Sequence, residues 1–564
     1  MPFAPPLDTQ LTCSTTVRRE IVAANWQMVR RDRCVLAALW VFCTLWNFDK
    51  AFHIDDAGHM VIAQWIAQNP LRPMSGLLFW GDTPESIHIT NQPHLFFYAM
   101  AVWGSVFGWS EISMHALQSI FCLLALIGMH KLAVRFTPHW PLVPTTLLAF
   151  SPAFAANQNS MVDIPLLALW LGFFVALCGR VQSTRRLHRA AAWCSAAILT
   201  KYTSLVLYLM LFYEVLRRQQ WRFASVLLTP LLALLAWSAF NYWDYGGIHI
   251  AQRKPGGMTA SGQMEWFLNQ ALAWLLALGA IVPGAIGLVV APYVSRSNTF
   301  WRFSVGLLAV GAMITVNAAT AMSGTADSEE SIYRMLKLFF IVSGAVLLVS
   351  AAGRLVRERL SAQAHTLKMD PGLALLALWA IGAFSFIVGL APFMATRHVL
   401  LALPPILLLT SRWLPADASK TWLAGVIAVS SLVATGVAAA DRWYANLYRT
   451  QATEIRKSLP SNATIWFAGH WGWQWYATQV GMLPFDPTSR QVKPGDYLVY
   501  PDSVAKQKLT ADLSPTHLRD VVIRPESFIS RLATPGAGLY SSTYWKLPWT
   551  INMGQVEVFH ILRF

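Results

Sequence analysis

Residues 34–59 of the chain read CVLAALWVFCTLWNFDKAFHIDDAGH. The first part is an apolar stretch of about 15 to 18 residues that begins near Cys34, and this length predicts an uncleaved first membrane helix. Two adjacent acids, Asp55 and Asp56, follow shortly after it. Because carboxylates are costly in or beside hydrocarbon, a pair at this depth is a candidate functional site.

The composition indicates a polytopic membrane protein. The 564 residues are 55% hydrophobic and 13% charged, with a mean hydropathy of +0.43, which excludes an ordinary soluble globule. The net charge of +15 does not indicate a nucleic-acid partner, because most Arg and Lys residues lie in short loops between apolar runs, where they orient membrane helices. The six cysteines show neither metal-ligand nor disulfide-like spacing.

The distribution of positive charge predicts a topology. Residues 1–33 are expected to form a cytoplasmic tail, because they carry several arginines before the first apolar run. Basic loops that should also be cytoplasmic recur at Lys131/Arg135, Arg180–Arg189, Arg217–Arg222, Arg296/Arg302, Arg354–Arg359 and Arg412/Lys420. The acidic or mixed loops that should face the opposite side are 51–111, Met161–Asp163, Asn241–Glu265, Ser323–Arg334 and Ala391–His398. This alternation predicts about thirteen spans over residues 34–440 and a C-terminus outside the cytoplasm.

Two segments fit this topology only with special geometry. The run Leu95–Phe107 has about 13 residues, fewer than the roughly 20 that a span needs, so we expect it to be re-entrant or to lie along the membrane surface. Ala190–Leu216 has two basic ends, so we expect two short helices that turn on the outer side near Lys201.

The composition changes after Asp441. Apolar runs shorten to strand length at Thr464–Ala468, Tyr497–Tyr500 and Val556–Phe559, and Pro, Gly and Asp separate them. This pattern predicts that residues 441–564 form a small extracytoplasmic α/β domain. Its aromatic cluster Gly469-His470-Trp471-Gly472-Trp473 suits either a domain core or a polysaccharide-binding surface.

Three acids are candidate catalytic residues. Adjacent side chains on a helix point about 100° apart, so Asp55 and Asp56 cannot form a facing acid/base dyad, and one is expected to support the other. Asp163 is the only acid in the second outer loop. The alternative is that these acids cap helix starts, for which Asp163 is well placed before Ile164-Pro165.

Five further side chains are candidate substrate-binding residues. His94 and Tyr98 belong to an aromatic segment that suits either a pocket for a sugar or an isoprenoid chain, or a packed membrane helix. Lys201, Arg397 and His398 place positive charge on the outer face, against the usual bias, which favours an anionic ligand such as a phosphate. Snorkelling or structural ion pairs are the alternative for these cations.

Several motif classes are absent from the sequence. It has no Walker A loop, metalloprotease His-Glu-x-x-His or Gly-x-Ser-x-Gly nucleophile elbow, so ATP-driven transport is not expected. His53, Asp55, Asp56 and His59 could ligate a divalent metal, but their spacing matches no defined site, and metal dependence stays open.

In their order along the chain, these short motifs resemble the GT-C superfamily of polytopic glycosyltransferases, in the branch of protein O-mannosyltransferases and lipid A aminoarabinose transferases. Asp55-Asp56-Ala57 is similar to that branch's Asp-Glu motif, and Asn91-Gln92-Pro93-His94-Leu95 to its Pro-Pro-Leu-aromatic segment. Asp56 stands where the family has Glu, and His94 where it has its second Pro. The later motifs follow in the family's order: Ser151-Pro152, Met161–Pro165, Thr200-Lys201-Tyr202 and Arg397-His398 with Leu403-Pro404-Pro405.

The resemblance implies transfer of a hexosyl or pentosyl group from a polyprenyl-phosphate donor to a hydroxyl-bearing protein, lipid or envelope glycan. The reaction would take place on the extracytoplasmic face of the membrane. If the protein is bacterial, this membrane is the inner membrane. Asp55 would be the general base, Asp163 would orient hydroxyl groups, and Lys201 and Arg397 would hold the phosphate. The sequence identifies no certain cofactor, and a divalent metal is the one candidate. A transporter or flippase of a lipid-linked glycan and a polysaccharide-binding subunit are the alternatives, and neither would consume the sugar-phosphate bond.

Overall fold

The computed structural model describes residues 30–89, 92–179, 184–218, 221–252, 260–294, 326–364, 370–488, 491–509, 515–536, 538–541 and 546–564. The predicted cytoplasmic tail up to residue 29 and the basic residues Arg296 and Arg302 lie outside these ranges. The same holds for the first residues of the predicted loop Ser323–Arg334.

The segment 51–111 follows the first helix, which covers residues 30–45. It contains α2 (Asp56–Gln68), the antiparallel hairpin of β1 (Leu77–Phe79) and β2 (Pro84–Ser86), the 3-10 turn η1 (Ile87–Ile89) and α3 (Leu95–Phe107). Helix α3 has the bounds predicted for the short apolar run. Its re-entrant or surface position in the membrane stays a prediction.

The central helices follow in close succession. They are α4 (Glu111–Phe136), α5 (Leu142–Ala149), α6 (Pro152–Ala155), α7 (Asp163–Leu177), α8 (Thr184–Ile198), η2 (Tyr202–Ser204), α9 (Leu205–Arg218), η3 (Trp221–Leu227), α10 (Leu228–Tyr245) and η4 (His249–Gln252). The chain turns between α8 and α9 at residues 199–204, which confirms the two short helices predicted within Ala190–Leu216. The membrane side of this turn stays a prediction.

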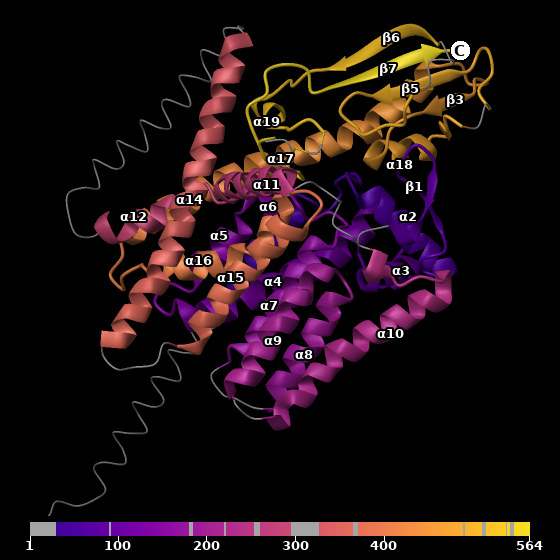
Figure 1. Cartoon of the computed structure of the whole chain (residues 1–564). Helices are drawn as coiled ribbons and strands as arrows, with labels where there is room; N and C mark the ends of the chain where they lie inside the picture. Colours follow the sequence, from indigo (N-terminus) through magenta and orange to yellow (C-terminus); the bar gives the residue numbers. More distant parts are fainter. Residues whose placement is uncertain are drawn as a thin grey trace, which may run out of the picture.

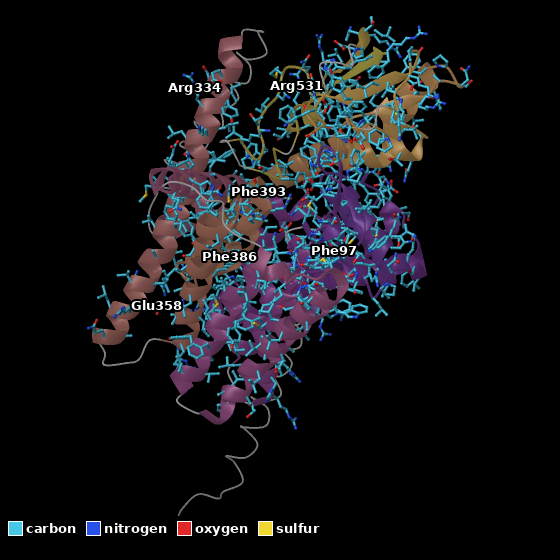
Figure 2. The ribbon with its side chains drawn as sticks, turned by 45° about the vertical axis from the view of Figure 1, so that its right-hand side comes forward. Phe97, Arg334, Glu358, Phe386, Phe393 and Arg531 are labelled. Carbon is cyan, nitrogen blue, oxygen red and sulfur yellow. The ribbon has the colours of Figure 1, made fainter. Side chains whose placement is uncertain are left out.

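The third group of helices completes the bundle. It comprises α11 (Ala260–Ile281), α12 (Ile286–Val294), α14 (Ala326–Ala364), α15 (Pro371–Leu390), η5 (Thr396–Leu401), α16 (Leu403–Ser411) and α17 (Lys420–Ser458). Residues 326–334, predicted as part of an outer loop, are the first turns of α14, and the basic residues 354–359 belong to the same helix. Figure 2 labels Arg334 and Glu358 near the two ends of this helix. The prediction that residues 326–334 form a loop is therefore wrong, because the helix continues well past its apolar middle. The membrane sides of its two ends stay predictions.

Six helices of the described residues are long and apolar enough to cross a membrane, so the chain is a multi-pass integral membrane protein. They are Glu111–Phe136, Phe223–Tyr245, Gly262–Ile281, Glu330–Gln363, Pro371–Leu390 and Lys420–Ser458. The total of about thirteen spans stays a prediction.

A five-stranded mixed sheet follows α17 and has the strand order β4-β3-β5-β7-β6. Its strands and helices are β3 (Ile465–Phe467), α18 (Trp471–Gln479), β4 (Leu483–Pro484), β5 (Tyr497–Pro501), β6 (Thr516–Ile523), α19 (Phe528–Arg531) and β7 (Glu557–Arg563). The three strands predicted from the sequence are therefore present as β3, β5 and β7. The predicted boundary at residue 441 falls inside α17, which runs from the helices toward the sheet in Figure 1.

Contacts from the C-terminal part fix the backbone just before the acidic pair. Helix α18 packs against it so closely that a Cβ on Gly472 would lie 2.4 Å from the Phe52 carbonyl oxygen. The Tyr476 hydroxyl accepts a hydrogen bond from the Phe52 amide at 2.8 Å, and the buried His53 ring stacks on Tyr448. The sheet region and its neighbouring helices thus hold the chain that leads to Asp55.

Candidate functional site

The backbone enters the acidic pair through a strained residue. Ile54 has a φ of +52°, although its β-branched side chain disfavours that region. Strain of this kind persists only where surrounding contacts hold it, and it gathers at functional sites. The turn at Ile54 precedes both acids: Asp55 is the residue before α2, and Asp56 is its first residue.

Asp56 points into the protein and Asp55 does not. The Asp56 side chain is fully buried and accepts a hydrogen bond from the His53 amide at 2.8 Å. Burial raises the pKa of Asp56 to about 7. The Asp55 side chain is 28% exposed and lines a cavity. The structure thus separates one solvent-accessible carboxylate from one buried neighbour, as the geometry of adjacent residues predicted.

Four of the predicted residues form one network of ion pairs, called the cavity network below. Arg397 Nη2 lies 2.7 Å from Asp55 Oδ2, and Arg397 Nε lies 3.1 Å from Asp163 Oδ2. Lys201 Nζ lies 3.2 Å from the other oxygen, Asp163 Oδ1. The tertiary structure thus connects α2, α7, η5 and the turn before η2 through charged side chains.

The acids in this network do not cap their helices. Asp55 is the residue before α2 but makes no side-chain capping bond, and the residue before α7 is Val162. Asp163 is the first residue of α7, where a negative charge is favoured by the helix dipole. Its oxygens are committed to Lys201 and Arg397. The capping alternative therefore does not explain these two acids.

The cavity beside the network has a volume of about 400 Å³. This is within the ordinary range for small-molecule sites. Its polar lining includes Asp55, Lys201, Arg397 and His398. The end of α15 and the following loop contribute apolar lining residues: Phe386, Ile387, Leu390 and Phe393. Figure 2 labels Phe386 and Phe393 near the middle of the molecule. The cavity thus combines charged groups with a surface suited to an apolar group.

His398 contributes a neutral imidazole to the cavity. Burial lowers its pKa well below the ordinary value, and nearby Lys201 lowers it further. Its Nδ1 atom has no hydrogen-bond partner among the described residues. A polar atom in this position is suited to a hydrogen bond with a bound molecule.

Other cavity residues were not predicted as site residues. Gln92 and His59 line the cavity and lie 2.9 Å apart between the Gln Nε2 and His Nε2 atoms, and Glu85 enters from β2. Trp80 covers α2 so closely that a Cβ on Gly58 would lie 2.9 Å from its ring. Gln92, His59 and Gly58 stood within the quoted motifs, whereas Glu85 and Trp80 reach the cavity only through the hairpin, which no motif marked.

His94 and Tyr98 lie away from the cavity network. His94 is fully buried at the start of α3 and its ring contacts Phe97 and Trp237. Tyr98 donates a hydrogen bond to the Pro70 carbonyl at 2.6 Å and lines a separate apolar groove. Figure 2 labels Phe97, the neighbour of both residues on this helix.

The four residues considered as metal ligands near the acidic pair do not converge. Asp56 and His53 are buried, Asp55 pairs with Arg397, and His59 Nδ1 lies 2.9 Å from the Ser160 carbonyl oxygen. Within the ranges that the structure describes, the only group of three metal-ligating side chains lies elsewhere. These four residues therefore do not form a metal site in this conformation.

Residues 91–243 match the family model of the Dolichyl-phosphate-mannose-protein mannosyltransferases. This match confirms the predicted similarity to the GT-C glycosyltransferases for the part of the chain that contains Asp163 and Lys201. Asp55 and Arg397 lie outside the matched part. A comparison with curated proteins found no match.

Three solved structures align with most of the chain at low sequence identity. ArnT from Cupriavidus metallidurans in the apo state has a TM-score of 0.42 and 14% identity, over 88% of this chain and 96% of that one. The same enzyme bound to undecaprenyl phosphate has a TM-score of 0.39 and 14% identity, over 84% and 93%. The oligosaccharyltransferase AglB from Archaeoglobus fulgidus, in complex with an inhibitory peptide and a dolichol-phosphate, has a TM-score of 0.40 and 13% identity, over 83% and 61%.

Proposed function

We propose that this protein is a membrane glycosyltransferase. It transfers a sugar from a polyprenyl-phosphate-linked donor to a hydroxyl-bearing acceptor at the extracytoplasmic face, where residues 441–564 form the outer domain. The observation that carries the proposal is the cavity network itself. Two carboxylates and two cations meet beside a cavity whose lining also includes apolar side chains from the end of α15 and the loop after it.

The cations suit the phosphate of the donor. Lys201 is 18% exposed and presents three N–H donors, of which one reaches Asp163. Arg397 lies beside Asp55 and Asp163, and a guanidinium can bind two phosphate oxygens at once. Both cations would offset the charge that grows on the phosphate as it leaves the sugar.

Asp55 is the general base in this proposal. The acceptor hydroxyl oxygen attacks the anomeric carbon, the bond from that carbon to the phosphate oxygen breaks, and the hydroxyl proton passes to Asp55. Polyprenyl phosphate leaves with the bonding electron pair and needs no strong acid, so one base suffices. Asp55 is the cavity-lining member of the acidic pair, whereas Asp56 is buried.

An apolar groove beside the cations suits the isoprenoid chain. It has a volume of about 520 Å³ and is lined by one face of α3 together with Pro165 and Thr200. Pro165 is two residues from Asp163, and Thr200 precedes Lys201. A lipid in this groove would carry its phosphate toward the cavity network, with roughly 0.8 kcal/mol gained for each buried methylene. Tyr98 would then contact the lipid and not the sugar.

The test uses the full-length protein in liposomes that contain a polyprenyl-phosphate sugar and an envelope extract as the source of acceptor. Asp55→Asn should lower the release of polyprenyl phosphate at least 100-fold, which is the usual range for loss of a general base. The matched control is Asp49→Asn, since Asp49 lies shortly before Asp55 in the chain and its half-exposed side chain pairs with Arg442.

Turnover retained in Asp55→Asn would contradict the assignment of the base. Movement of intact lipid-linked sugar across the bilayer without release of polyprenyl phosphate would instead show a flippase. Mass spectrometry of envelope proteins, lipids and glycans, with and without the gene, identifies the acceptor and the sugar.

A further inference from the structure

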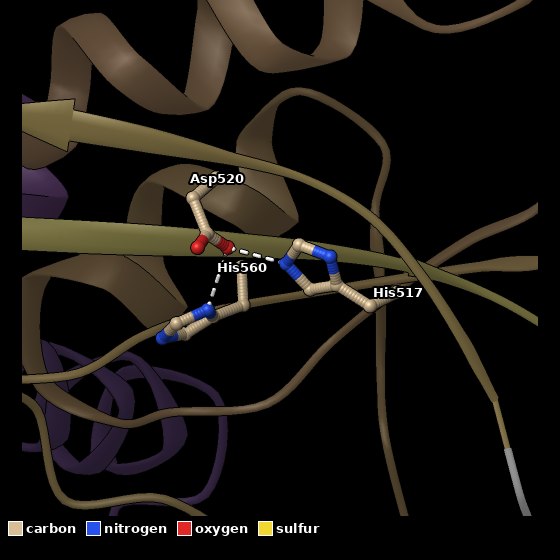
Figure 3. A group of neighbouring side chains, drawn as sticks. All are labelled: His517, Asp520 and His560. Carbon is tan, nitrogen blue, oxygen red and sulfur yellow. Dashed lines mark hydrogen bonds and ion pairs between the residues drawn. The ribbon is translucent and has the colours of Figure 1, made fainter.

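Three metal-ligating side chains converge on the outer strands of the C-terminal sheet. Asp520 Oδ1 lies 2.7 Å from His517 Nε2 and 2.8 Å from His560 Nδ1, and the three atoms lie within 4.8 Å of one another. Figure 3 shows both imidazole rings directed at the one carboxylate. None of the three residues lines the cavity proposed for catalysis.

A strand irregularity brings the three side chains to one face. Asp520 on β6 is paired directly with His560 on β7, so these side chains share a face. His517 is three residues before Asp520, and on a regular strand it would point to the opposite face. The register shifts between His517 and Arg519, and an extra residue in a strand reverses the alternation. The bulge therefore returns His517 to the face of Asp520.

A second carboxylate orients one of the histidines. Asp502 Oδ2 lies 3.0 Å from His560 Nε2, and Asp502 is itself paired with Lys506 at 3.2 Å. With the Nε2 hydrogen donated to Asp502, loss of the Nδ1 proton would free the Nδ1 lone pair for a metal ion. Histidines that bind metals usually donate their other N–H to a carboxylate in this way.

We infer that His517, Asp520 and His560 bind a divalent transition-metal ion, with Zn²⁺ as the best match. Two imidazoles and one carboxylate suit Zn²⁺ better than Mg²⁺ or Ca²⁺, which prefer oxygen ligands only. Ligands at about 2.0–2.2 Å from zinc lie roughly 3.3–3.5 Å apart in a tetrahedron, so a small outward movement of the rings admits the ion. The fourth position is open to water or to an external ligand.

The ion would join an exposed edge strand to its neighbour. Strand β6 is the outermost strand of the sheet, and most of its residues are exposed. Edge strands with irregular register are weakly specified. A metal bridging β6 and β7 fixes the bulged register and stabilises the outer part of the sheet.

The test measures zinc binding to the full-length protein in detergent, purified without a polyhistidine tag and stripped with a chelator. Equilibrium dialysis against ZnCl₂ should give one zinc ion per chain for the wild type. Asp520→Asn and His560→Ala should each weaken binding at least tenfold, and Asp502→Asn about tenfold, as for loss of an orienting partner. Added zinc should raise the Tm of the wild type and not that of Asp520→Asn.

His188→Ala is the matched control, because His188 is an exposed histidine on α8. It should bind zinc as the wild type does, and so should Asp55→Asn, which separates this site from the catalytic proposal. Equal Tm values without zinc show that the variants are folded. Zinc binding that is absent in the wild type, or unchanged in both His517→Ala and His560→Ala, would mean that the cluster is an ion-pair group only and would overturn the inference.

Discussion

The cavity network and the Lys50–Asp441 pair are both groups of ion-paired side chains, but they differ in how the hydrogen-bond donors of their cations are used. Lys50 is fully buried and its Nζ contacts Asn47 Oδ1, the Ala156 carbonyl oxygen and Asp441 Oδ2, at 2.8, 2.7 and 3.0 Å. These three partners satisfy its three N–H groups. Lys201 and Asp55 in the cavity network instead remain partly exposed at a cavity.

We call the Lys50–Asp441 pair closed, because its lysine donors are all used inside the protein, and the cavity network open, because its side chains reach a cavity. Asp441 also accepts a hydrogen bond from Tyr540 at 2.7 Å, so the closed pair ties the segment before Asp55 to α17 and to the C-terminal part. A buried pair with saturated donors has no capacity for a ligand and serves to hold segments together. An ion pair that lines a cavity can exchange one partner for a substrate phosphate.

The largest expected effect concerns the closed pair. Lys50→Met leaves Asp441 buried without its counter-ion and should lower the free energy of unfolding by about 3–5 kcal/mol. Thermal unfolding in detergent measures this loss as a lower Tm. The double variant Lys50→Met/Asp441→Asn should recover part of it, because the uncompensated charge is gone. A Tm for Lys50→Met equal to that of the wild type would contradict the structural role.

A smaller expected effect concerns the open network. Arg397→Gln should reduce transfer about 100-fold, equivalent to about 2.7 kcal/mol of transition-state stabilisation, because the leaving phosphate loses a charged partner. The measurement is release of polyprenyl phosphate at equal amounts of folded protein. Arg442→Gln is the control, since Arg442 forms a half-exposed ion pair with Asp49, outside the cavity network. An equal loss of polyprenyl phosphate release in both variants would contradict a specific role of Arg397 in binding the phosphate.

The smallest expected effect is a pH-dependent change in Tm that depends on Asp56, the buried acid beside the open network. Burial raises its pKa to about 7, so the folded protein holds a proton that the unfolded chain releases above a pKa of 3.8. The stability that this proton provides is present at low pH and is lost as the pH rises through about 7. The Tm of the wild type should therefore fall relative to that of Asp56→Asn between pH 5 and pH 8.

The comparison of the wild type with Asp56→Asn isolates the effect of Asp56 on Tm from the effects of neighbouring titratable groups. Burial lowers the pKa of His53 to about 4, which gives an opposite trend at acidic pH, but this trend is common to both proteins. Lys50 and Asp55 also act on Asp56 and are unchanged in the variant. A Tm difference that is constant with pH would show that Asp56 is charged in the folded protein throughout this range.

Much of the helical part follows from local pattern. An apolar run predicted α3 with its bounds. The two basic ends of Ala190–Leu216 predicted the turn between α8 and α9. The prediction of a loop at residues 326–334 was wrong for a physical reason. Polar residues at the end of a long helix keep their backbone hydrogen bonds in water, so charge does not mark the end of α14.

The amino-acid sequence by itself determined that the chain crosses a membrane, and it identified Asp55, Asp163, Lys201 and Arg397 as unusual charges, because burial of charge in an apolar chain is costly enough to stand out. Only the tertiary structure decided that these four side chains are in contact and that Asp56 is buried. It alone also brought His517, Asp520 and His560 together. Contacts between residues hundreds of positions apart depend on how helices and strands pack, and a one-residue bulge reverses which face a side chain occupies.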